Sequence, residues 1–434
     1  MPEFEENSLE YASREKIEAR QFRRLQALLS FLKNESVNRF YQEKLKTVNP
    51  AEINSREALA QVPFTYKSEL VAEQTTNPPF GSIFSYPISN YVKLHQTSGT
   101  TGRPLKVLDT REDWEWWARC WEQVYRAAGV GADDRVFLAF SFGPFVGFWA
   151  AHEGAYRIGA LTIPGGGMDT AQRLAAIIEN EATVLCCTPS YALHMAEVAA
   201  QNGIDLAASS VRVTIHAGEP GASIPAVRRR IEQSWGARCY DHAGGTEIGA
   251  WGFSCKEQRG LHLNEAEFIA EVLDRETGQP VEPGQPGELV ITNLGRRGFP
   301  LIRYRTGDVV EIAAEPCACG RSYTLFEDGV IGRADDMVVV RGINVYPSSV
   351  DAIVREVVDS REYRMVFYRE GDLDQLAVEV ELEASEEEKL EQLKSLFRQR
   401  MALNVPVSAV TPGQLPRFQL KARRVVDNRP RLNR

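Results

Sequence analysis

A loop rich in glycine and hydroxyl side chains lies between two extended apolar runs, where residues 96–107 read QTSGTTGRPLKV. Glycine adopts backbone conformations that are closed to other residues, so successive N–H groups of this loop can converge on an anion. Serine and threonine hydroxyls add donors, and Arg103 adds positive charge. The loop therefore has the chemistry of a phosphate-binding loop, and its candidate contacts are Thr97, Ser98, Gly99, Thr100, Thr101 and Gly102.

Two other kinds of segment share this composition. The nucleotide-binding loop G-x-x-x-x-G-K-[ST] differs in glycine spacing, and no Lys-Ser or Lys-Thr follows the last glycine here. A Ser/Thr/Gly linker would look alike in composition, but linkers seldom lie between strand-like segments. The apolar runs on both sides therefore favour phosphate binding.

Apolar strands and amphipathic helices alternate around this loop. Residues 15–46 carry apolar side chains at helical spacing, and residues 113–129 predict a helix with a tryptophan stripe that is more typical of a core than of a ligand site. Short β-rich runs follow, with a helix expected over 171–181 between two of them. These runs are residues 135–140, 160–164, 183–187 and 211–217. The alternation favours parallel sheets with crossover helices.

The second half of the chain changes character twice. Residues 259–294 are β-rich with Gly and Pro turns, which is consistent with an antiparallel subdomain. After Gly332 the pattern is strand, helix, two strands, helix and strand, a compact module of about 100 residues. We therefore predict an α/β fold with a large N-terminal domain (residues 1–333) of parallel-type sheets, crossover helices and a β-rich subdomain, and a small α+β C-terminal domain (residues 334–434).

Composition excludes several classes of protein. The 434 residues carry a formal net charge of -9 without a dense Lys/Arg run before the end of the chain, which argues against a nucleic-acid-binding surface. No segment approaches the roughly 20 apolar residues of a membrane span, and the acidic N-terminus lacks an apolar signal core. Seven cysteines, an odd number, do not suggest a disulfide framework. We expect a soluble cytoplasmic protein.

The loop and five later segments resemble, in chain order, the acyl-adenylating superfamily of acyl-CoA synthetases, peptide-synthetase adenylation domains and luciferases. These segments are HAGEP (216–220), YDHAGGTEIG (240–249), YRTGD (304–308), GRADDMVVVRG (332–342) and PRFQLKARRVVD (416–427). Within the superfamily the chain looks most like the phenylacetate-CoA ligases, because IPGGGMDTAQR, TPSYALHMAE and the ending KARRVVDNRP are also similar to theirs. The resemblance covers nearly the whole chain.

The resemblance implies roles for the matching positions. Thr246 would contact the α-phosphate of ATP and Glu247 would help to hold Mg²⁺, for which hydroxyl and carboxylate oxygens are suitable ligands. Asp308 would bind both ribose hydroxyls, although Asp after Gly is also a common plain turn residue. Lys421 would be a mobile catalytic lysine that stabilises transition-state charge, although a lysine near a chain end is ordinarily only solvated.

The remaining matches would line the nucleotide, the hinge and the coenzyme A channel. Asp335 would be the pivot of a hinge that makes the small domain mobile, Arg333 would contact the nucleotide, and Gly342 would lie by the pantetheine channel. The nucleotide contacts further include Ala217, Gly218, Glu219, Pro220, Asp241, His242, Ala243 and Gly244. Two positions depart from the family pattern: Ala243 replaces a tyrosine, and Arg103 replaces a lysine and presents a planar fork.

A metal site is also implied, because some of these relatives carry one. Cys255, His262, Cys317 and Cys319 could supply three thiolates and one imidazole to a closed, tetrahedral, structural zinc site. Spacing alone does not establish four ligands from distant segments, and unpaired buried or loop cysteines are the alternative.

We expect an ATP-dependent acid–thiol ligase that adenylates a small aromatic or arylacetic acid, releases pyrophosphate and transfers the acyl group to coenzyme A. Phe142, Phe145, Phe148 and Trp149 offer enough aromatic surface for a ring, although a buried helix would use the same residues. The alternatives are an adenylating enzyme that passes acyl or AMP to a carrier protein, amine or cofactor, and a non-catalytic nucleotide-binding relative. The sequence does not specify the oligomeric state; relatives often form homodimers, so a homodimer is one possibility.

Overall fold

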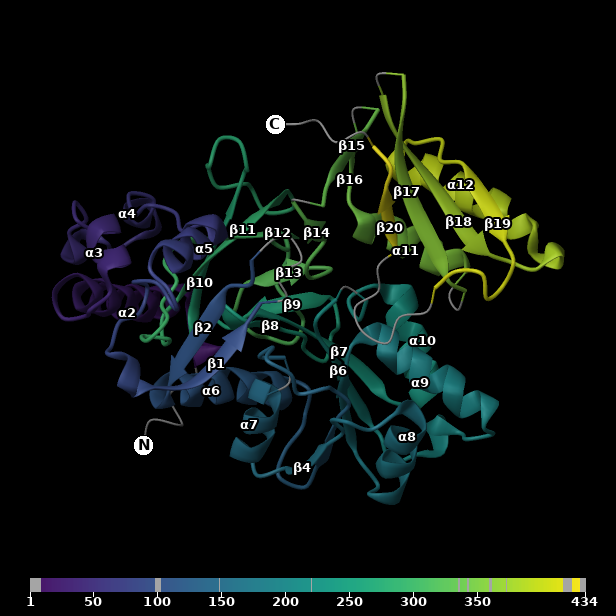
Figure 1. The fold of residues 1–434 in the computed structure, drawn as a ribbon, viewed down its shortest axis with the longest axis horizontal. Helices are drawn as coiled ribbons and strands as arrows, with labels where there is room; N and C mark the ends of the chain where they lie inside the picture. The colour runs from purple at the N-terminus through teal and green to yellow at the C-terminus, as the bar shows by residue number, and fades with distance from the viewer. Residues whose placement is uncertain are drawn as a thin grey trace.

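An eight-stranded sheet lies at the centre of the molecule (Figure 1). The computed structural model describes residues 9–97, 103–147, 149–219, 221–334, 336–341, 343–358, 361–371, 373–416 and 424–429. The strand order is β13-β9-β8-β7-β6-β5-β3-β4. The strands are β3 (Arg135–Leu138), β4 (Leu161–Pro164), β5 (Val184–Cys187), β6 (Val213–His216), β7 (Arg238–Gly245), β8 (Gly249–Phe253), β9 (Gly260–Leu263) and β13 (Leu325–Glu327).

The strands from β4 to β7 are parallel, and each is joined to the next along the chain by a helix. The connecting helices are α7 (Trp149–Arg157), α8 (Thr170–Glu179), α9 (Pro189–Gln201) and α10 (Pro225–Trp235). Every residue of β5 and β6 is buried, as expected for strands covered on both faces. The predicted parallel sheet with crossover helices is therefore confirmed.

Antiparallel strands make up the β-rich part, as predicted. One sheet has the order β10-β11-β12-β14, and a separate hairpin, β1-β2, encloses the glycine-rich loop. These strands are β1 (Tyr91–Gln96), β2 (Lys106–Thr110), β10 (Phe268–Leu273), β11 (Pro286–Asn293), β12 (Tyr304–Glu311) and β14 (Gly332–Arg333).

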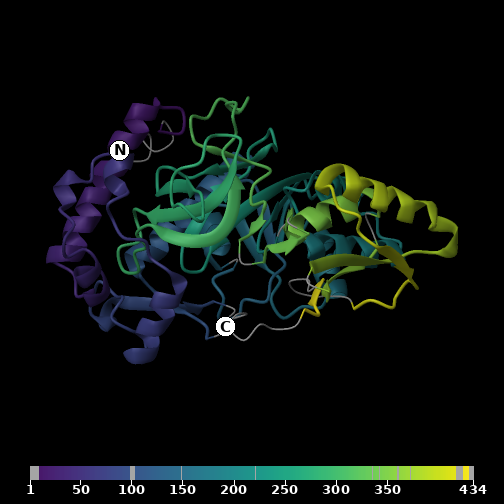
Figure 2. The same ribbon diagram turned by 90° about the horizontal axis from the view of Figure 1, so that it is seen from above.

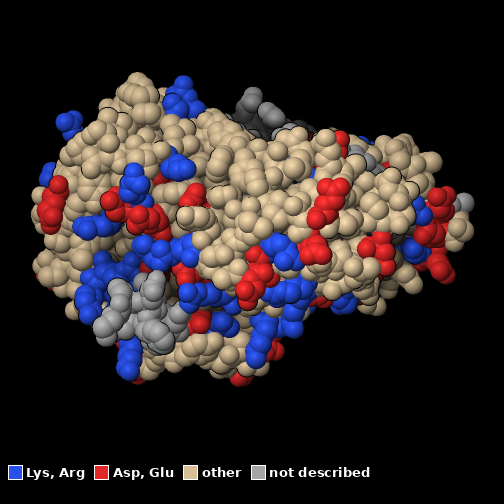
Figure 3. Space-filling view, turned by 90° about the horizontal axis from the view of Figure 1, so that it is seen from below, with Lys and Arg blue, Asp and Glu red and all other residues tan. Residues whose placement is uncertain are grey.

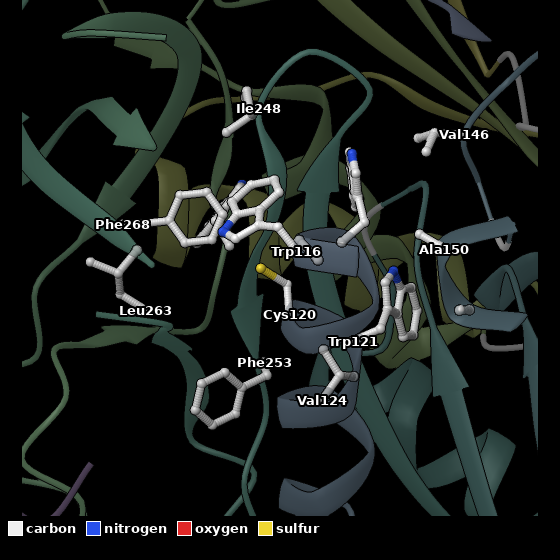
Figure 4. Close-up of a cluster of buried hydrophobic side chains, with 14 of the residues drawn as sticks. Trp116, Cys120, Trp121, Val124, Val146, Ala150, Ile248, Phe253, Leu263 and Phe268 are labelled. Carbon is white, nitrogen blue, oxygen red and sulfur yellow. The ribbon is translucent and has the colours of Figure 1, made fainter. Parts of the chain in front are cut away.

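Helix α6 (Arg111–Ala127) carries the predicted tryptophan stripe into the main hydrophobic core. Trp114, Trp117 and Trp121 are all buried, which confirms that the stripe is core. Trp116, which was not assigned to the stripe, is fully buried as well; it points toward Phe268 in Figure 4, and the two ring centroids are 5.4 Å apart. Its indole nitrogen donates to a carboxylate oxygen of Glu267 at 2.6 Å, which satisfies this buried donor.

The helical region expected over residues 15–46 is confirmed, and it consists of two helices. The structure contains α2 (Arg14–Asn34) and α3 (Arg39–Lys44), separated by a short turn. The break occurs because Asn38 Oδ1 accepts a hydrogen bond from the backbone N–H of Tyr41 at 3.0 Å and thereby caps a new helix. Two further helices, α4 (Arg56–Leu59) and α5 (Lys67–Thr76), lead to the hairpin.

The C-terminal part has a sheet and a hydrophobic core of its own, on the opposite side of the molecule from the N-terminal helices (Figures 1 and 2). The sheet order is β19-β18-β17-β20. The elements of the C-terminal part are β15 (Val338–Val340), β16 (Ile343–Val345), α11 (Pro347–Val357), β17 (Tyr363–Glu370), β18 (Leu373–Glu381), α12 (Glu388–Met401), β19 (Val407–Val410) and β20 (Val425–Asp427). The order agrees with the predicted α+β module, except that two strands instead of one precede α11 and two instead of one follow α12.

Positive and negative side chains are mixed over the face of the molecule shown in Figure 3. Many of them form ion pairs across the surface; Glu122, for example, contacts both Arg126 and Arg157. Within the described ranges, no helix has both the length and the apolar sequence that crossing a bilayer requires.

Candidate active site

The hairpin β1-β2 closes the glycine-rich loop at its base. Thr97 is buried, its backbone N–H donates to the Leu105 carbonyl, and its hydroxyl accepts from the Leu105 N–H, with both bonds 3.0 Å long. Arg103 donates to the Thr75 hydroxyl on α5 at 3.2 Å. The other predicted loop contacts, residues 98–102, lie outside the described residues, so the structure defines the two ends of the loop.

Glu247 lies in the turn between β7 and β8 and is buried. Its Oε1 atom accepts a hydrogen bond from the Tyr304 hydroxyl at 3.0 Å and lies 3.0 Å from Lys67 Nζ. Burial acts to raise the pKa of this carboxyl, but the Lys67 ammonium and the Tyr304 hydroxyl outweigh burial and hold its pKa below the usual range. The turn therefore presents an ionised carboxylate.

Arg296 binds the backbone of the same turn. Its guanidinium donates to the carbonyl oxygens of Thr246 and Glu247, each at 2.9 Å, and to Asp109 Oδ1 at 2.7 Å. Arg296 and Asp109 are both fully buried, and Asp109 belongs to β2. One buried ion pair thus connects the hairpin of the glycine-rich loop to the turn that carries Thr246 and Glu247.

The Arg296→Met variant is expected to lose about 3–5 kcal/mol of unfolding free energy, because it leaves the Asp109 carboxylate buried without a partner. Urea unfolding would measure the loss. The double variant Arg296→Met/Asp109→Asn should recover part of it. Arg400→Met removes an exposed ion pair with Glu356 and should cost about 1 kcal/mol or less. Equal losses in the two single variants would contradict the role assigned to the buried pair.

Asp308 and Arg333 are brought together as register partners on β12 and β14. Arg333 Nη1 donates to Asp308 Oδ1 at 2.9 Å, and the Asp308 backbone N–H donates to the Thr306 hydroxyl. Both belong to the predicted nucleotide contacts. Asp335 and Gly342, the predicted hinge and channel positions, lie outside the described residues.

The HAGEP segment begins at His216, the last residue of β6. Gly218 has a positive φ of 93°, a conformation that glycine adopts without strain. The Glu219 carboxylate accepts from the backbone N–H of Ser190 at 2.8 Å and so caps the start of α9. Ala217 packs against the main core, and Pro220 lies outside the described residues.

The DHAG segment lies on β7, next to β8. The Asp241 carboxylate accepts from the Ser223 hydroxyl, and burial raises the pKa of Asp241 to about 6. His242 Nδ1 lies 2.7 Å from the Gly252 carbonyl, and burial lowers the pKa of His242 to about 4, so this ring is neutral. A side chain at Gly244 would meet the β8 backbone at 2.8 Å, and Ala243 pairs with Gly252. Close packing of the two strands thus accounts for the small residues here.

Sequence reasoning missed Lys67, Arg296 and Asp109, and it gave Tyr304 no role. Lys67, Asp109 and Arg296 lie outside the sequence motifs. Tyr304 belongs to YRTGD, but that motif has no recognised spacing to Glu247. The four residues converge on the Thr246–Glu247 turn only because α5, β2, β12 and the loop after β11 meet there.

Two family models match the chain. The model of AMP-binding enzymes matches residues 89–295, and the model of the AMP-binding enzyme C-terminal domain matches residues 342–429. The phenylacetate-coenzyme A ligase of Thermus thermophilus is 34% identical over 97% of this chain and 98% of its own length. The chain belongs to the AMP-binding enzyme family. As a member of this family it is an AMP-forming acid–CoA ligase, with ATP and coenzyme A as its co-substrates.

Two solved structures of 2-hydroxyisobutyryl-CoA ligase resemble this AMP-binding enzyme, with different TM-scores. The structure in the postadenylation state in complex with R3-HIB-AMP has a TM-score of 0.91 at 29% identity, covering 97% of this chain and 92% of that one. The structure with 2-HIB-AMP and CoA in the thioesterification state has a TM-score of 0.74 at 30% identity, covering 98% and 92%. Coverage and identity are nearly equal, so the arrangement of parts in this enzyme matches the postadenylation structure.

The cluster Cys255, His262, Cys317 and Cys319 is assembled in this AMP-binding enzyme, with all four candidate ligand atoms within 4.8 Å of one another. The sulfur atoms of Cys255 and Cys317 are 3.6 Å apart, and Cys319 Sγ lies 3.4 Å from His262 Nε2. Two thiolates at about 2.3 Å from a tetrahedral zinc would be about 3.8 Å apart. His262 Nδ1 lies 3.1 Å from the Tyr323 carbonyl, an orientation that leaves Nε2 available to a metal. The donor set and its spacing fit zinc.

Proposed function

We propose that this ligase activates a small aromatic or arylacetic acid and transfers its acyl group to coenzyme A. The observation that carries the proposal is the buried, ionised Glu247 in a turn that a buried ion pair ties to the glycine-rich hairpin. The substrate class is supported by the relative of Thermus thermophilus, a phenylacetate-coenzyme A ligase.

The reaction has two transfer steps. A carboxylate oxygen of the acid attacks the α-phosphorus of ATP, the bond to the β-phosphate oxygen breaks, and pyrophosphate leaves. The coenzyme A sulfur then attacks the acyl carbon, the bond to AMP breaks, and the thiol proton is released. The acid itself is the first nucleophile, so no serine or cysteine nucleophile is needed.

Glu247 has the carboxylate oxygens that would help to hold Mg²⁺ on the phosphates, and the Thr246 hydroxyl would contact the α-phosphate. Mg²⁺, when bound, supplies positive charge beside the phosphate oxygens. Glu247 is suited to this role because its carboxyl is ionised and its Oε1 is already oriented by two donors. Asp308, paired with Arg333, is assigned to the ribose, and Arg333 to the nucleotide.

Aromatic side chains before α7 are assigned to the wall of the acid pocket. The rings of Phe142 and Trp149 meet edge to face with centroids 4.9 Å apart, and Trp149 Nε1 donates to the Gly143 carbonyl at 3.1 Å. A side chain at Gly166 would approach the Phe142 ring to 2.9 Å, so the IPGGG loop closes on this ring. Phe142 and Phe145 precede the helix, which begins at Trp149, and Phe145 is 39% exposed. Such a surface can accept an aryl ring.

Pyrophosphate release with ATP and Mg²⁺ tests the function across aromatic, arylacetic and aliphatic acids, each with and without coenzyme A. Release stimulated by an aryl acid and by coenzyme A is the expected result. Acid-dependent release without coenzyme A stimulation would indicate that the enzyme uses another acceptor, such as a carrier protein or an amine. Release with aliphatic acids only would contradict the assigned substrate class.

We also propose that Cys255, His262, Cys317 and Cys319 hold a structural zinc ion. Four protein ligands leave no open coordination position for catalysis. The cluster joins the strands around β8 and β9 to the loop before β13, and burial lowers the pKa of His262 to about 4, which keeps its imidazole neutral and able to bind a metal.

Removal of one thiolate should release this metal. The wild-type enzyme is expected to contain about one zinc per chain, and Cys317→Ser is expected to contain almost none and to unfold at a lower temperature, because structural zinc adds directly to folding free energy. Elemental analysis and thermal unfolding would measure both effects. Cys239→Ser, at a buried cysteine outside the cluster, should keep the metal. A zinc-free wild-type preparation made without chelators would refute the site.

The boundary between the two domains is assigned near residues 333–336, with residues 1–333 and 334–434 on its two sides and a pivot at Asp335. The separate C-terminal core, which begins at Val338, supports this boundary. Contacts between α11 and both α10 and β14 would then change when the small domain rotates. A homodimer, which the family resemblance implies, stays a prediction for analytical ultracentrifugation.

A further inference from the structure

Lys67 is the one charged contact that the proposed magnesium ligand Glu247 makes within the described part of the chain. Lys67 Nζ lies 3.0 Å from Glu247 Oε1, and the lysine side chain is 43% exposed while that of glutamate is 10% exposed. The residue precedes the stretch matched by the AMP-binding family model, which begins at residue 89. Neither the sequence motifs nor the family match therefore assigns Lys67 a role.

The backbone on the N-terminal side of Lys67 is fixed against β12. The Thr65 N–H donates to the Arg303 carbonyl and the Arg305 N–H donates to the Thr65 carbonyl, both at 3.0 Å, and Thr65 is fully buried. Helix α5 begins at Lys67, and Glu69 accepts from the Tyr66 N–H at 2.8 Å to close its first turn. Lys67 is thus anchored to the strand that also carries Tyr304 and Asp308.

The two donors to Glu247 use the same oxygen. Tyr304 and Lys67 both contact Oε1, and no described residue makes a hydrogen bond to Oε2. Burial and the neighbouring carboxylate raise the pKa of Tyr304 well above its ordinary value, so its hydroxyl remains a donor. The carboxylate is consequently held in one orientation with one oxygen engaged and the other available.

We propose that Lys67 is a positioning residue of the adenylation step, which holds Glu247 in the orientation in which its second oxygen can bind the magnesium of Mg·ATP. This inference rests on the proposed function, because it gives Glu247 the magnesium role. Lys67 adds no atom to the reaction. Its effect falls on the step that uses Mg·ATP, and the transfer from acyl-adenylate to coenzyme A does not depend on it.

Lys67→Ala and Lys67→Arg, with Lys44→Ala as the matched control, test the inference. Lys44, like Lys67, pairs with a glutamate, but its partner is Glu69 on α5 rather than Glu247. We expect Lys67→Ala to lower the rate of acid-dependent ATP–pyrophosphate exchange about 10- to 100-fold, the range for losing one charge-assisted hydrogen bond. The Mg²⁺ concentration for half-maximal exchange should rise. Thiolysis of supplied acyl-adenylate should stay within about twofold of wild type, and Lys67→Arg should restore most of the exchange.

The Mg²⁺ dependence gives a readout that a merely structural role would not change. Equal loss of exchange and thiolysis, or an unchanged Mg²⁺ dependence, would overturn the inference.

Calorimetric titration with ATP, with and without Mg²⁺, separates this inference from the proposed function. It needs no acid substrate, so it applies even where no tested acid stimulates pyrophosphate release. The wild-type and Lys44→Ala enzymes should bind ATP more tightly with Mg²⁺, and Lys67→Ala should lose most of that gain. A gain equal to that of wild type would overturn the role of Lys67, whereas a silent acid panel alone would count only against the substrate assignment. Lys67→Met, which retains the apolar stem of the side chain, replaces Lys67→Ala if the latter is unstable.

Discussion

Glu247→Gln is expected to lower adenylate formation about 10²- to 10³-fold, because an amide is a neutral and weaker ligand for the metal that stabilises the phosphate charge. The substitution preserves the shape of the side chain, and the Tyr304 hydroxyl can still donate to the amide oxygen. The loss should therefore come from charge rather than from misfolding. ATP–pyrophosphate exchange would measure it, with thiolysis of supplied acyl-adenylate recorded on the same preparation.

Glu122→Gln is the matched control for this variant. Glu122 is a partly buried glutamate that pairs with Arg126 and Arg157 at the end of α6, and it has no contact with the Thr246–Glu247 turn. It should retain wild-type exchange. A Glu247→Gln enzyme with near-normal exchange would remove Glu247 from the magnesium site, and the inference about Lys67 would then lose its basis.

Lys421→Ala should have an effect of similar size on adenylation, about 10²- to 10³-fold, while thiolysis of supplied acyl-adenylate stays close to the wild-type rate. Lys421 itself lies outside the described residues, but β20 begins four residues later and pairs in parallel with β17. Arg424 forms an ion pair with Glu362 just before that strand. These contacts fix residues 424–427 to the C-terminal sheet, and we expect adenylation to depend on the position of that sheet.

Separate assays of the two half-reactions would measure this prediction. Lys394→Ala is the control, because Lys394 lies on α12 of the same C-terminal part and pairs only with Glu391 among the described residues. It should leave both rates unchanged. If Lys421→Ala slows both half-reactions equally, its role is not confined to adenylation.

Comparison with 2-hydroxyisobutyryl-CoA ligase explains why two half-reactions must be assayed. The arrangement described here agrees with the postadenylation structure, at a TM-score of 0.91, and less well with the thioesterification structure, at 0.74. If the small domain rotates as proposed, contacts such as that of α11 with β14 would belong to one arrangement of the two parts, and a variant at this contact would affect one half-reaction more than the other.

The fold class, the order of most elements and the family could all be predicted from the sequence alone. Alternating apolar runs and amphipathic helices predict parallel strands because burial on both faces requires apolar strands and crossover connections require helices. The glycine-rich loop, the Thr-Glu turn and YRTGD could be located because their chemistry depends on adjacent residues. The apolar periodicity over residues 15–46 did not reveal that this region forms two helices, because the periodicity continues across Asn38, which caps the second helix.

The residues that support the site could be identified only from the tertiary structure. Lys67, Asp109, Arg296 and Tyr304 reach the Thr246–Glu247 turn from elements that are far apart in the chain. A Lys or Arg at such positions is indistinguishable in sequence from a solvated surface residue. Ion pairing and a shifted pKa depend on burial and on separations of about 3 Å, and both arise only after the sheets have packed. The four metal-ligating candidates follow the same rule, since β8, β9 and the loop before β13 bring them within 4.8 Å of one another.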